Sequence, residues 1–403
     1  MPLFFFLCVF TAKQEGTTSL DDLCRELLKE GIEIRKQSLQ DRFSKEATLF
    51  MREMVEHALS KKLGLDKKNI ECKFGRIVIN DSTVFQLPAE YSEAYRGSGG
   101  GGSNAAIKIQ YCYDVLSQEM IDITEQDGTK SDHEYPLQDL RAKDLRMEDL
   151  GYFKIERLRT ISKAGAYFLS RLKFGITLYI LKNGEYKKLN LQKVITKMQE
   201  GEIKTLWVYI GNNELFGTKL TLEKVPKEVA DEKRRKLKTD KQNKRKVVSK
   251  ERLALCDVNA FVTNCTTEEL PDPLLRQCYS LRWQIEIIFK AWKTFFKIDK
   301  VAQMKLHRFE CFHYGCLMWI IASTHLLAYF KHWYLNKNNK EISELKFFKL
   351  MASIKQEIKE VIKSKQYQIS GFLDQLAGQI ERTCIKECKK NKLTPLKIIA
   401  KIP

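Results

Sequence analysis

Long apolar runs are scarce in this sequence of 403 residues. The run from Leu3 to Phe10 is too short to span a bilayer, and no basic segment precedes it as in a signal peptide. The longer run from Phe312 to Phe330 contains His313, Gly315 and His325, so we expect a buried helix there rather than a membrane span. These features predict a cytoplasmic protein that does not associate with a membrane.

Cysteine clusters and nucleotide-binding motifs are also missing. The 11 cysteines are an odd number spread over the whole length, without the dense framework of a disulfide-stapled domain, and they indicate reduced thiols. The glycine-rich run at 97–103 lacks the Gly-Lys-Ser/Thr of a phosphate-binding loop and is typical of a flexible connector. We find no internal repeats, which argues against a solenoid.

Acidic residues are outnumbered. The 70 Lys and Arg residues exceed the 51 Asp and Glu residues and give a formal net charge of +19. Such an excess favours a polyanionic partner, because each cation placed on a phosphate releases condensed counterions. A highly soluble basic enzyme is the alternative. Hydrophobic and charged contents of 43% and 30% are typical of a globular protein, and the length allows two or three domains.

Residues 1–70 are predicted to be a helical N-terminal region. Thr18 and Ser19 precede a periodic stretch that ends near Gly31, and a second helix is expected from Ser38 through Met54. Two such helices could form a DNA-binding helix-turn-helix that recognises a DNA end. We favour a plain packing hairpin, because this pattern is common in helical regions.

Strand patterns begin after this region. The β-branched run 77–79 ends in Asn80-Asp81, which predicts a buried strand with a carboxylate at its C-terminal end. Period-two alternation over 107–113 predicts a half-buried strand. Further strands are expected at 120–123, 145–149 and 167–172, with a helix over roughly 152–162. This succession predicts an α/β fold with a mixed sheet.

From 173 to 263 the sequence is β-rich, with strands expected at 176–181, 206–210 and 220–222. The basic run 224–252 interrupts them with 13 Lys and Arg against 5 Asp and Glu. This run is either a solvated mobile loop or a segment that contacts a DNA backbone, and the two are compatible. After Thr266 the sequence is predicted to be helical almost to the end, and 331–403 are predicted to be a helical C-terminal region.

The segment 279–293 carries the most informative pattern. On an ideal helix Tyr279, Arg282, Glu286 and Lys293 share one face, while apolar residues cover the opposite side. A surface salt bridge is the simple explanation for Arg282 and Glu286 four residues apart. The tyrosine and the lysine on the same stripe weaken that explanation.

This spacing, Tyr-x2-Arg-x3-Glu-x6-Lys, resembles the signature of bacterial DDE transposases of the insertion sequence 4 type. The block Asp81-Ser82-Thr83 is similar to the family's first catalytic aspartate, and the block 149–153, beginning Asp149-Leu150-Gly151, resembles its second. Residues 167–173 resemble a family strand that carries a DNA-contacting arginine. The intervals between the three carboxylates also match, and the family places a β-rich insertion in the second interval.

The resemblance implies a ribonuclease-H-like catalytic domain formed by residues 71–172 and 264–330, with 173–263 as a β-rich basic insertion domain. It implies that Asp81, Asp149 and Glu286 are the catalytic residues and hold two Mg²⁺ ions, for which Mn²⁺ can substitute. Two cations about 4 Å apart can activate the nucleophile and stabilise the leaving oxygen. Carboxylate oxygens are the ligands that Mg²⁺ prefers.

The resemblance also implies contacts with DNA. Arginine can hold a phosphate through two hydrogen bonds, whereas lysine acts as a point charge. The expected DNA-binding residues are Tyr279, Arg282, Trp283, Lys290, Lys293, Arg171 and Lys173. Aromatic side chains can stack on a flipped base, and Trp207 and Trp283 are both candidates. For Trp207 we favour a place in the core of a strand, and for Trp283 both explanations stay open.

These expectations predict a bacterial cut-and-paste transposase at the nucleoid. It would nick double-stranded DNA at the terminal inverted repeats of its element and join the freed 3′-hydroxyls to target DNA. The resemblance implies hairpin ends and a homodimer in the synaptic complex. One alternative is a metal-dependent DNA nuclease of the same fold. The other is a domesticated, non-catalytic DNA-binding protein, against which the three carboxylates argue.

Overall fold

The computed structural model describes residues 2–11, 19–61, 63, 72–99, 102–212, 214–243, 247–338, 340–364, 367–387 and 393–403. The chain forms two compact units, each assembled from three stretches of sequence. Unit 1 comprises Met1–Asn69, Ser82–Lys130 and Trp283–Lys392, and unit 2 comprises Ile70–Asp81, Ser131–Arg282 and Leu393–Pro403. Strand β1, Arg76–Leu87, passes from unit 2 into unit 1 after Asp81.

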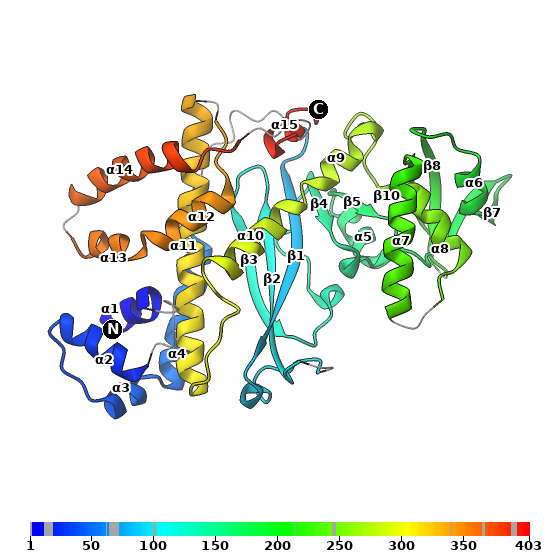
Figure 1. The fold of residues 1–403 in the computed structure, drawn as a ribbon. Helices are drawn as coiled ribbons and strands as arrows, with labels where there is room; N and C mark the ends of the chain where they lie inside the picture. The colour runs from blue at the N-terminus through cyan, green and yellow to red at the C-terminus, as the bar shows by residue number, and fades with distance from the viewer. Residues whose placement is uncertain are drawn as a thin grey trace. The chain divides into compact units, whose positions relative to one another are not determined.

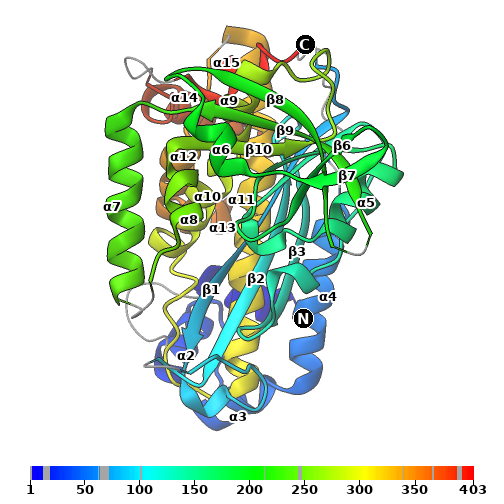
Figure 2. The same cartoon turned by 90° about the vertical axis from the view of Figure 1, so that its right-hand side faces the viewer.

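Unit 2 is built on a mixed sheet (Figures 1 and 2). Its strand order is β1-β4-β5-β10-β9-β8-β6-β7. The pairs β1–β4 and β4–β5 are parallel, and every later pair in this order is antiparallel. The strands after β1 are β4 (Asp144–Glu148), β5 (Tyr167–Arg171), β6 (Leu178–Lys182), β7 (Glu185–Lys188), β8 (Ile203–Ile210), β9 (Phe216–Lys224) and β10 (Val258–Thr263).

Helices cover the two faces of this sheet differently. A hydrophobic core lies on one face, where Leu158 and Ile161 of α5 and Ile195 of α6 pack on strands β5, β8, β9 and β10. The helix α9 lies on the other face, over β4 and β5. The α-helices of unit 2 are α5 (Ile155–Lys163), α6 (Leu191–Thr196), α7 (Lys227–Asn243), α8 (Lys250–Ala254), α9 (Leu275–Ser280) and α15 (Pro395–Ile399). Its 3-10 turns are η3 (Asp132–Glu134), η4 (Leu150–Tyr152), η5 (Leu255–Asp257) and η6 (Asp272–Leu274).

The strands of residues 173–263 continue the sheet of unit 2. We expected a β-rich subdomain that leaves the sheet after β5, but β10 pairs with β5 and links β9, β8, β6 and β7 to it. The expected strands are present. Within the basic run, residues 227–243 form helix α7 rather than a loop. The strands of 173–263 join the sheet because of backbone hydrogen bonds between distant segments, and local sequence patterns do not reveal such pairing.

Unit 1 packs helices around a long central helix, α11 (Leu306–Asn338), which contacts α4, η1 and α12 (Figure 1). Its strand order is β3-β2-β1, with β2 and β3 antiparallel. The strands after β1 are β2 (Ala105–Asp114) and β3 (Met120–Asp127). The helices are α1 (Pro2–Phe6), the π-helix η1 (Leu7–Thr11), α2 (Leu20–Lys29), α3 (Lys36–Arg42), α4 (Lys45–Ser60), η2 (Ala89–Tyr91), α10 (Trp283–Thr294), α12 (Glu344–Ser353), α13 (Lys355–Lys363) and α14 (Tyr367–Thr383).

Two predictions for unit 1 are corrected. The single helix expected from Ser38 to Met54 is broken after Arg42, because Phe43 leaves helical dihedrals and Ser44 caps α4 by accepting a hydrogen bond from the Ala47 amide. The strand expected to be half-buried over 107–113 is buried at every position of β2. Alternation in sequence does not require an exposed face when neighbouring elements cover both sides.

The buried helix expected at 312–330 lies inside α11. Among the described residues, Leu306–Lys337 is the one helix long and apolar enough to cross a membrane by length and composition. The most apolar 18-residue stretch of this helix is 72% buried inside the protein, as in the core helix of a globular unit.

Candidate active site

Asp81 and Asp149 lie on neighbouring parallel strands of unit 2. The register of β1 and β4 pairs Asn80 with Glu148. Asp81 and Asp149 are the residues that directly follow this pair. In-register residues of parallel strands point to the same face, and adjacent strands lie about 4.8 Å apart. The two carboxylates are therefore neighbours on one face of the sheet. Asp81 lies inside β1 rather than at its end, because the strand continues to Leu87.

Arg282 holds the first of these carboxylates. Its Nη1 donates to Oδ2 of Asp81 at 2.6 Å, and both side chains are largely shielded from solvent. Arg282 does not lie on a continuous helix, as the ideal-helix pattern predicted. Leu281 and Arg282 form a turn between α9 and α10, in which their amides donate to the carbonyls of Cys278 and Tyr279 three residues back. This turn directs the guanidinium to Asp81.

Tyr279 supports the second carboxylate from α9. Its hydroxyl donates to the backbone carbonyl of Glu148 at 3.2 Å, one residue before Asp149, and its ring packs on Phe261. Burial raises the pKa of Tyr279; the nearby Asp149 also raises it, whereas Arg282 and Arg171 oppose the rise. The hydroxyl is therefore a proton donor that fixes the end of β4.

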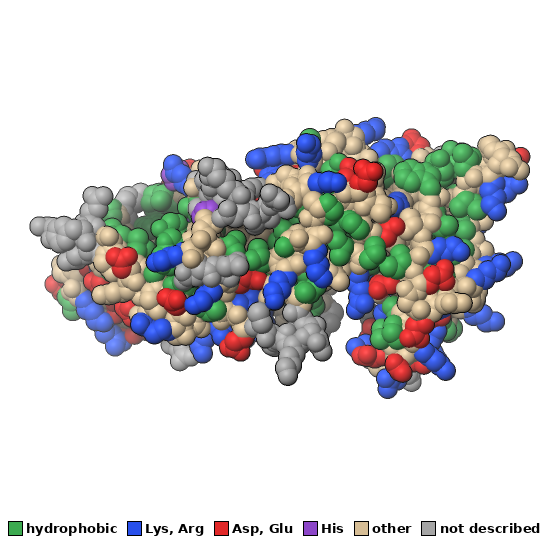
Figure 3. Space-filling model, turned by 90° about the horizontal axis from the view of Figure 1, so that it is seen from above, with side chains coloured by type: hydrophobic (Ala, Val, Ile, Leu, Met, Phe, Trp, Pro, Cys, Tyr) green, Lys and Arg blue, Asp and Glu red, His purple; other side chains and the backbone are tan. Residues whose placement is uncertain are grey.

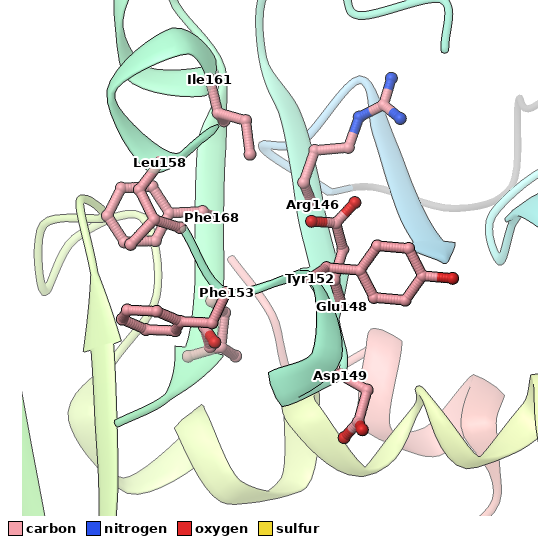
Figure 4. A pocket seen from close by; sticks show the side chains of 10 residues that line it. Arg146, Glu148, Asp149, Tyr152, Phe153, Leu158, Ile161 and Phe168 are labelled. Carbon is pink, nitrogen blue, oxygen red and sulfur yellow. The ribbon is translucent and has the colours of Figure 1, made fainter. Parts of the chain in front are cut away.

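A buried ion pair backs Asp149 from the opposite face of the sheet. Nε and Nη2 of Arg157 each donate to a Glu148 carboxylate oxygen at 2.6 Å, and Nη1 donates to the Tyr135 carbonyl. Glu148 lies in a small pocket together with apolar side chains of α5 and β5 (Figure 4). Figure 4 also shows that the Asp149 carboxylate points away from the apolar side chains of this pocket. We did not predict this pair from the sequence, although a charged residue directly before a catalytic candidate was a visible signal.

The cations predicted on β5 extend the site in unit 2. Arg171 is exposed at the end of β5, and the register places it beside Asp149, because Met147 pairs with Leu169 two residues earlier. Lys173 is also exposed and donates from Nζ to the Phe153 carbonyl at 3.4 Å.

The remaining predicted residues belong to α10 of unit 1. Glu286 is half-buried in the first turn of the helix, where the helix dipole favours a negative charge. Lys290 is exposed, and Lys293 donates from Nζ to the Val84 carbonyl at 3.4 Å. Trp283, at the start of α10, is 59% exposed. The apolar residues predicted on the other side, such as Ile285 and Ile288, are buried as expected.

The donor set of unit 2 is suited to a hard cation. Magnesium is commonly held by one or two carboxylates together with waters and substrate phosphates, and Asp81 and Asp149 supply two neighbouring carboxylates. Across the residues that the structure describes, no group of three or more His, Cys, Asp or Glu side chains is placed to hold a metal. In this structure Oδ2 of Asp81 accepts a hydrogen bond from Arg282.

Comparisons with known proteins agree on one family. Residues 73–321 match the family model described as "Transposase DDE domain". The transposase for insertion sequence element IS1151 of Clostridium perfringens is 33% identical over 388 residues, covering 91% of this chain and 82% of that protein. The transposase for IS231F of Bacillus thuringiensis subsp. israelensis is 30% identical over 361 residues, covering 84% and 76%.

A solved structure of a piggyBac transposase synaptic complex with hairpin DNA covers 92% of this chain and 74% of its own, with a TM-score of 0.45 and 11% identity. This likeness is too distant to establish a shared fold.

Proposed function

Because this chain belongs to the DDE transposases, we propose that it is a cut-and-paste transposase of the insertion sequence 4 type. It would cleave DNA at the terminal inverted repeats of its element and transfer the freed strands into target DNA. The observation that carries this proposal is the pair Asp81 and Asp149 on one sheet face. The signature residue Arg282 is bonded to Asp81, and the signature residue Tyr279 is bonded to the Glu148 carbonyl directly before Asp149.

We propose Glu286 as the third carboxylate. In sequence it follows Arg282 by four residues, and Arg282 is itself bonded to Asp81. The family uses divalent metal, generally Mg²⁺, and Asp81, Asp149 and Glu286 would hold two ions, with Mn²⁺ as a substitute. When bound, such ions make a water or hydroxyl more acidic and stabilise the leaving oxygen of a phosphodiester.

The other signature residues would bind and orient the DNA. Arg171 lies beside Asp149 and would neutralise a phosphate there, while Arg282 would exchange Asp81 for a phosphate oxygen. Tyr279 keeps its proton and positions Asp149 through the Glu148 carbonyl. Trp283, Lys290, Lys293 and Lys173 are proposed as further DNA contacts, and the exposure of Trp283 supports its role.

The remaining proposals concern the architecture of the reaction. The strand orders β3-β2-β1 and β1-β4-β5 support a ribonuclease-H-like catalytic fold from residues 71–172 and 264–330. Residues 173–263 would act as a basic insertion that contacts DNA, and 1–70 would help to recognise the ends. We propose hairpin ends, a homodimer in the synaptic complex, and action in the bacterial cytoplasm at the nucleoid.

The decisive test is Glu286→Gln, which keeps the size and helix preference of the side chain but removes its charge. We expect this variant to bind terminal-repeat DNA as tightly as the wild type at equal salt, because its cations are unchanged. We expect no Mg²⁺-dependent nicking. A gel shift and a strand-cleavage assay on the same labelled duplex measure both properties.

The controls separate the alternatives. Glu360→Gln, at an exposed position of α13, should bind and nick like the wild type. Arg282→Ala should weaken binding and joining together. Undiminished nicking by Glu286→Gln would show that the third carboxylate lies elsewhere. If the wild-type protein cleaves DNA but does not join it to target DNA, the protein is a nuclease and not a transposase.

A further inference from the structure

The sheet face of unit 2 that carries the aspartates extends well beyond them. Paired strands keep partners on one face, so the register can be followed from strand to strand. From Asp149 it passes to Arg171 on β5, Phe261 on β10, Thr221 on β9 and Thr205 on β8. Four strand spacings of about 4.8 Å place β8 about 19 Å from β4. Residues of β8 two or four positions after Thr205 therefore lie on the same sheet face as Asp149.

Trp207 and Tyr209 stand on this face of β8, and Trp207 was expected in the core. Its side chain is 59% exposed, because the core face of β8 is formed by Leu206, Val208 and Ile210 instead. Tyr209 lies two residues further on the same face and forms an edge contact with Tyr186 of β7, with ring centroids 4.9 Å apart. Tyr186 is itself 50% exposed.

Gly217 fixes the orientation of these rings. It pairs with Tyr209 across β8 and β9, and a Cβ at this position would come within 3.3 Å of both the Trp207 indole and the Tyr209 ring. The glycine therefore leaves room for the two rings to lie against the backbone. A tryptophan held in this way presents a fixed and accessible aromatic surface, with little side-chain entropy left to lose on binding.

The cover on this face ends beside Trp207. Asp272 of η6 accepts hydrogen bonds from Lys219 and Thr205, which closes the sheet over β9 and the start of β8. Beyond Asp272 on this sheet face, the exposed aromatic residues in the described part of the chain are Trp207 and Tyr186. Lys188 of β7 is also exposed and lies on the same side of the sheet as Tyr186. The local charges are mixed, since Glu185 lies within 3.5 Å of Lys187.

We propose that Trp207, Tyr209 and Tyr186 form a stacking platform for the bases of an unpaired DNA strand. The identity of the ligand as DNA rests on the proposed function. Stacking on exposed aromatics is how nucleic-acid-binding sheets hold single strands, and it needs no base-specific hydrogen bonds. At 3.4 Å per nucleotide, 19 Å corresponds to about six positions from the site, within reach of the same DNA molecule. Cations such as Lys188 would meet its backbone.

The test compares two DNA forms without metal. Binding of labelled oligothymidine and of a labelled duplex is measured by fluorescence anisotropy in EDTA, with wild type, Trp207→Ala and Trp207→Phe. We expect Trp207→Ala to weaken single-strand binding about ten-fold and duplex binding less than two-fold, because one stacked base is lost. Trp207→Phe should retain most of the single-strand affinity. The salt dependence should not change, because no phosphate contact is removed.

Tyr329→Ala, at another exposed aromatic on α11, is the matched control and should bind both forms like the wild type. Equal losses for single strand and duplex, or no loss for either, would overturn the platform. Self-association of the wild type that Trp207→Ala abolishes would also overturn it, in favour of a second copy of the chain.

Mg²⁺-dependent cleavage of terminal-repeat duplex is measured in parallel. If the protein cleaves the duplex but Trp207→Ala binds single-stranded DNA like the wild type, the platform is refuted and the proposed function is not. Failure of cleavage with a Trp207-dependent single-strand affinity refutes the proposed function and leaves the platform in place.

Discussion

Arg282 and Tyr279 support the two aspartates of unit 2 in different ways. Arg282 bonds directly to the Asp81 carboxylate, whereas Tyr279 acts through the Glu148 carbonyl. The spacing of these residues predicted that they belong to one site. It could not predict the bonds, because an ideal helix places Arg282 on a continuous stripe while the chain makes a turn at Leu281 and Arg282. The site residues follow from residue type and spacing, but their partners depend on contacts distant in sequence.

Glu148→Gln tests how far the buried pair with Arg157 supports Asp149. Both side chains are nearly inaccessible, so the change leaves a guanidinium buried without its counter-ion and should cost about 3–5 kcal/mol of the free energy of unfolding. Urea denaturation measures the loss. Arg157→Met added to Glu148→Gln should recover much of it, since no uncompensated charge remains.

The matched control is the exposed pair Arg52–Glu56, where Glu56→Gln should cost less than about 1 kcal/mol. A loss at Glu148 no larger than this would show that Arg157 finds other partners. Nicking by Glu148→Gln should also fall under conditions where the variant remains folded, because the end of β4 is less firmly held.

Local patterns predicted elements well where local interactions decide them. The β-branched run 77–79 is in a buried strand, and the strands expected at 120–123, 145–149 and 167–172 are present. Failures occurred where tertiary contacts decide. The period of β2 did not show that both of its faces are covered, and the composition of 224–252 did not reveal helix α7.

The packing of η1 on α11 gives a prediction at the scale of elements. A Cβ on Gly315 would lie 2.2 Å from the Cys8 carbonyl oxygen and 2.5 Å from its carbon, so the backbones must separate to admit it. We expect Gly315→Ala to destabilise the protein by about 1–3 kcal/mol, as overpacking does. Thermal denaturation followed by circular dichroism measures this change.

Gly371→Ala is the control within another helix, α14. Its Cβ would meet no atom within 4 Å, so the substitution should instead stabilise the protein by about 0.5–1 kcal/mol through helix propensity. Equal effects at the two positions would contradict the close approach of η1 and α11.

A buried ion cluster that joins α11 to α12 should make stability depend on pH. Burial alone would raise the pKa of Glu344, but Lys331 and Lys386 lower it to about 2, from an ordinary value of 4.5. A carboxyl with a depressed pKa contributes stability that is complete above pH 4.5. This contribution is lost as pH falls from 4.5 toward 2.

Glu344→Gln should therefore lower stability near neutral pH and flatten its fall within that acidic window. Unfolding by urea at several pH values compares the variant with the wild type. An unchanged slope in this window would show that other carboxylates cause the acid limb.

At the scale of the whole molecule, the regions predicted from the sequence rest on changes in local texture, whereas the two compact units rest on packing. We expected boundaries near 172 and 263, where the local texture changes. Two of the places where the chain passes between the compact units follow Asp81 and Arg282, inside or directly before elements that carry site residues. Such a division reflects packing between distant segments, which periodicity does not record.

The formal net charge of the chain is +19. Figure 3 shows Lys and Arg side chains spread over the face that it displays, with Asp and Glu among them. Helix α7 is where the sequence left two explanations open, a solvated segment or a contact with the DNA backbone. Lys227, Arg235 and Lys238 are exposed on it, whereas Lys233 donates to the Asn259 side chain and Arg234 is paired with Asp257.

The salt dependence of DNA binding decides between these explanations. In duplex DNA each phosphate contact contributes about 0.9 to the slope of log affinity against log salt. The triple variant Lys227→Gln, Arg235→Gln, Lys238→Gln should therefore reduce the slope by about 2 to 3 if α7 tracks the backbone, with affinity falling most at low salt. Filter binding of terminal-repeat duplex over a range of salt concentrations measures it. Lys349→Gln, at an exposed position of α12, removes one positive charge outside α7 and should leave the slope unchanged. An unaltered slope in the triple variant would assign the cations of α7 to solvent.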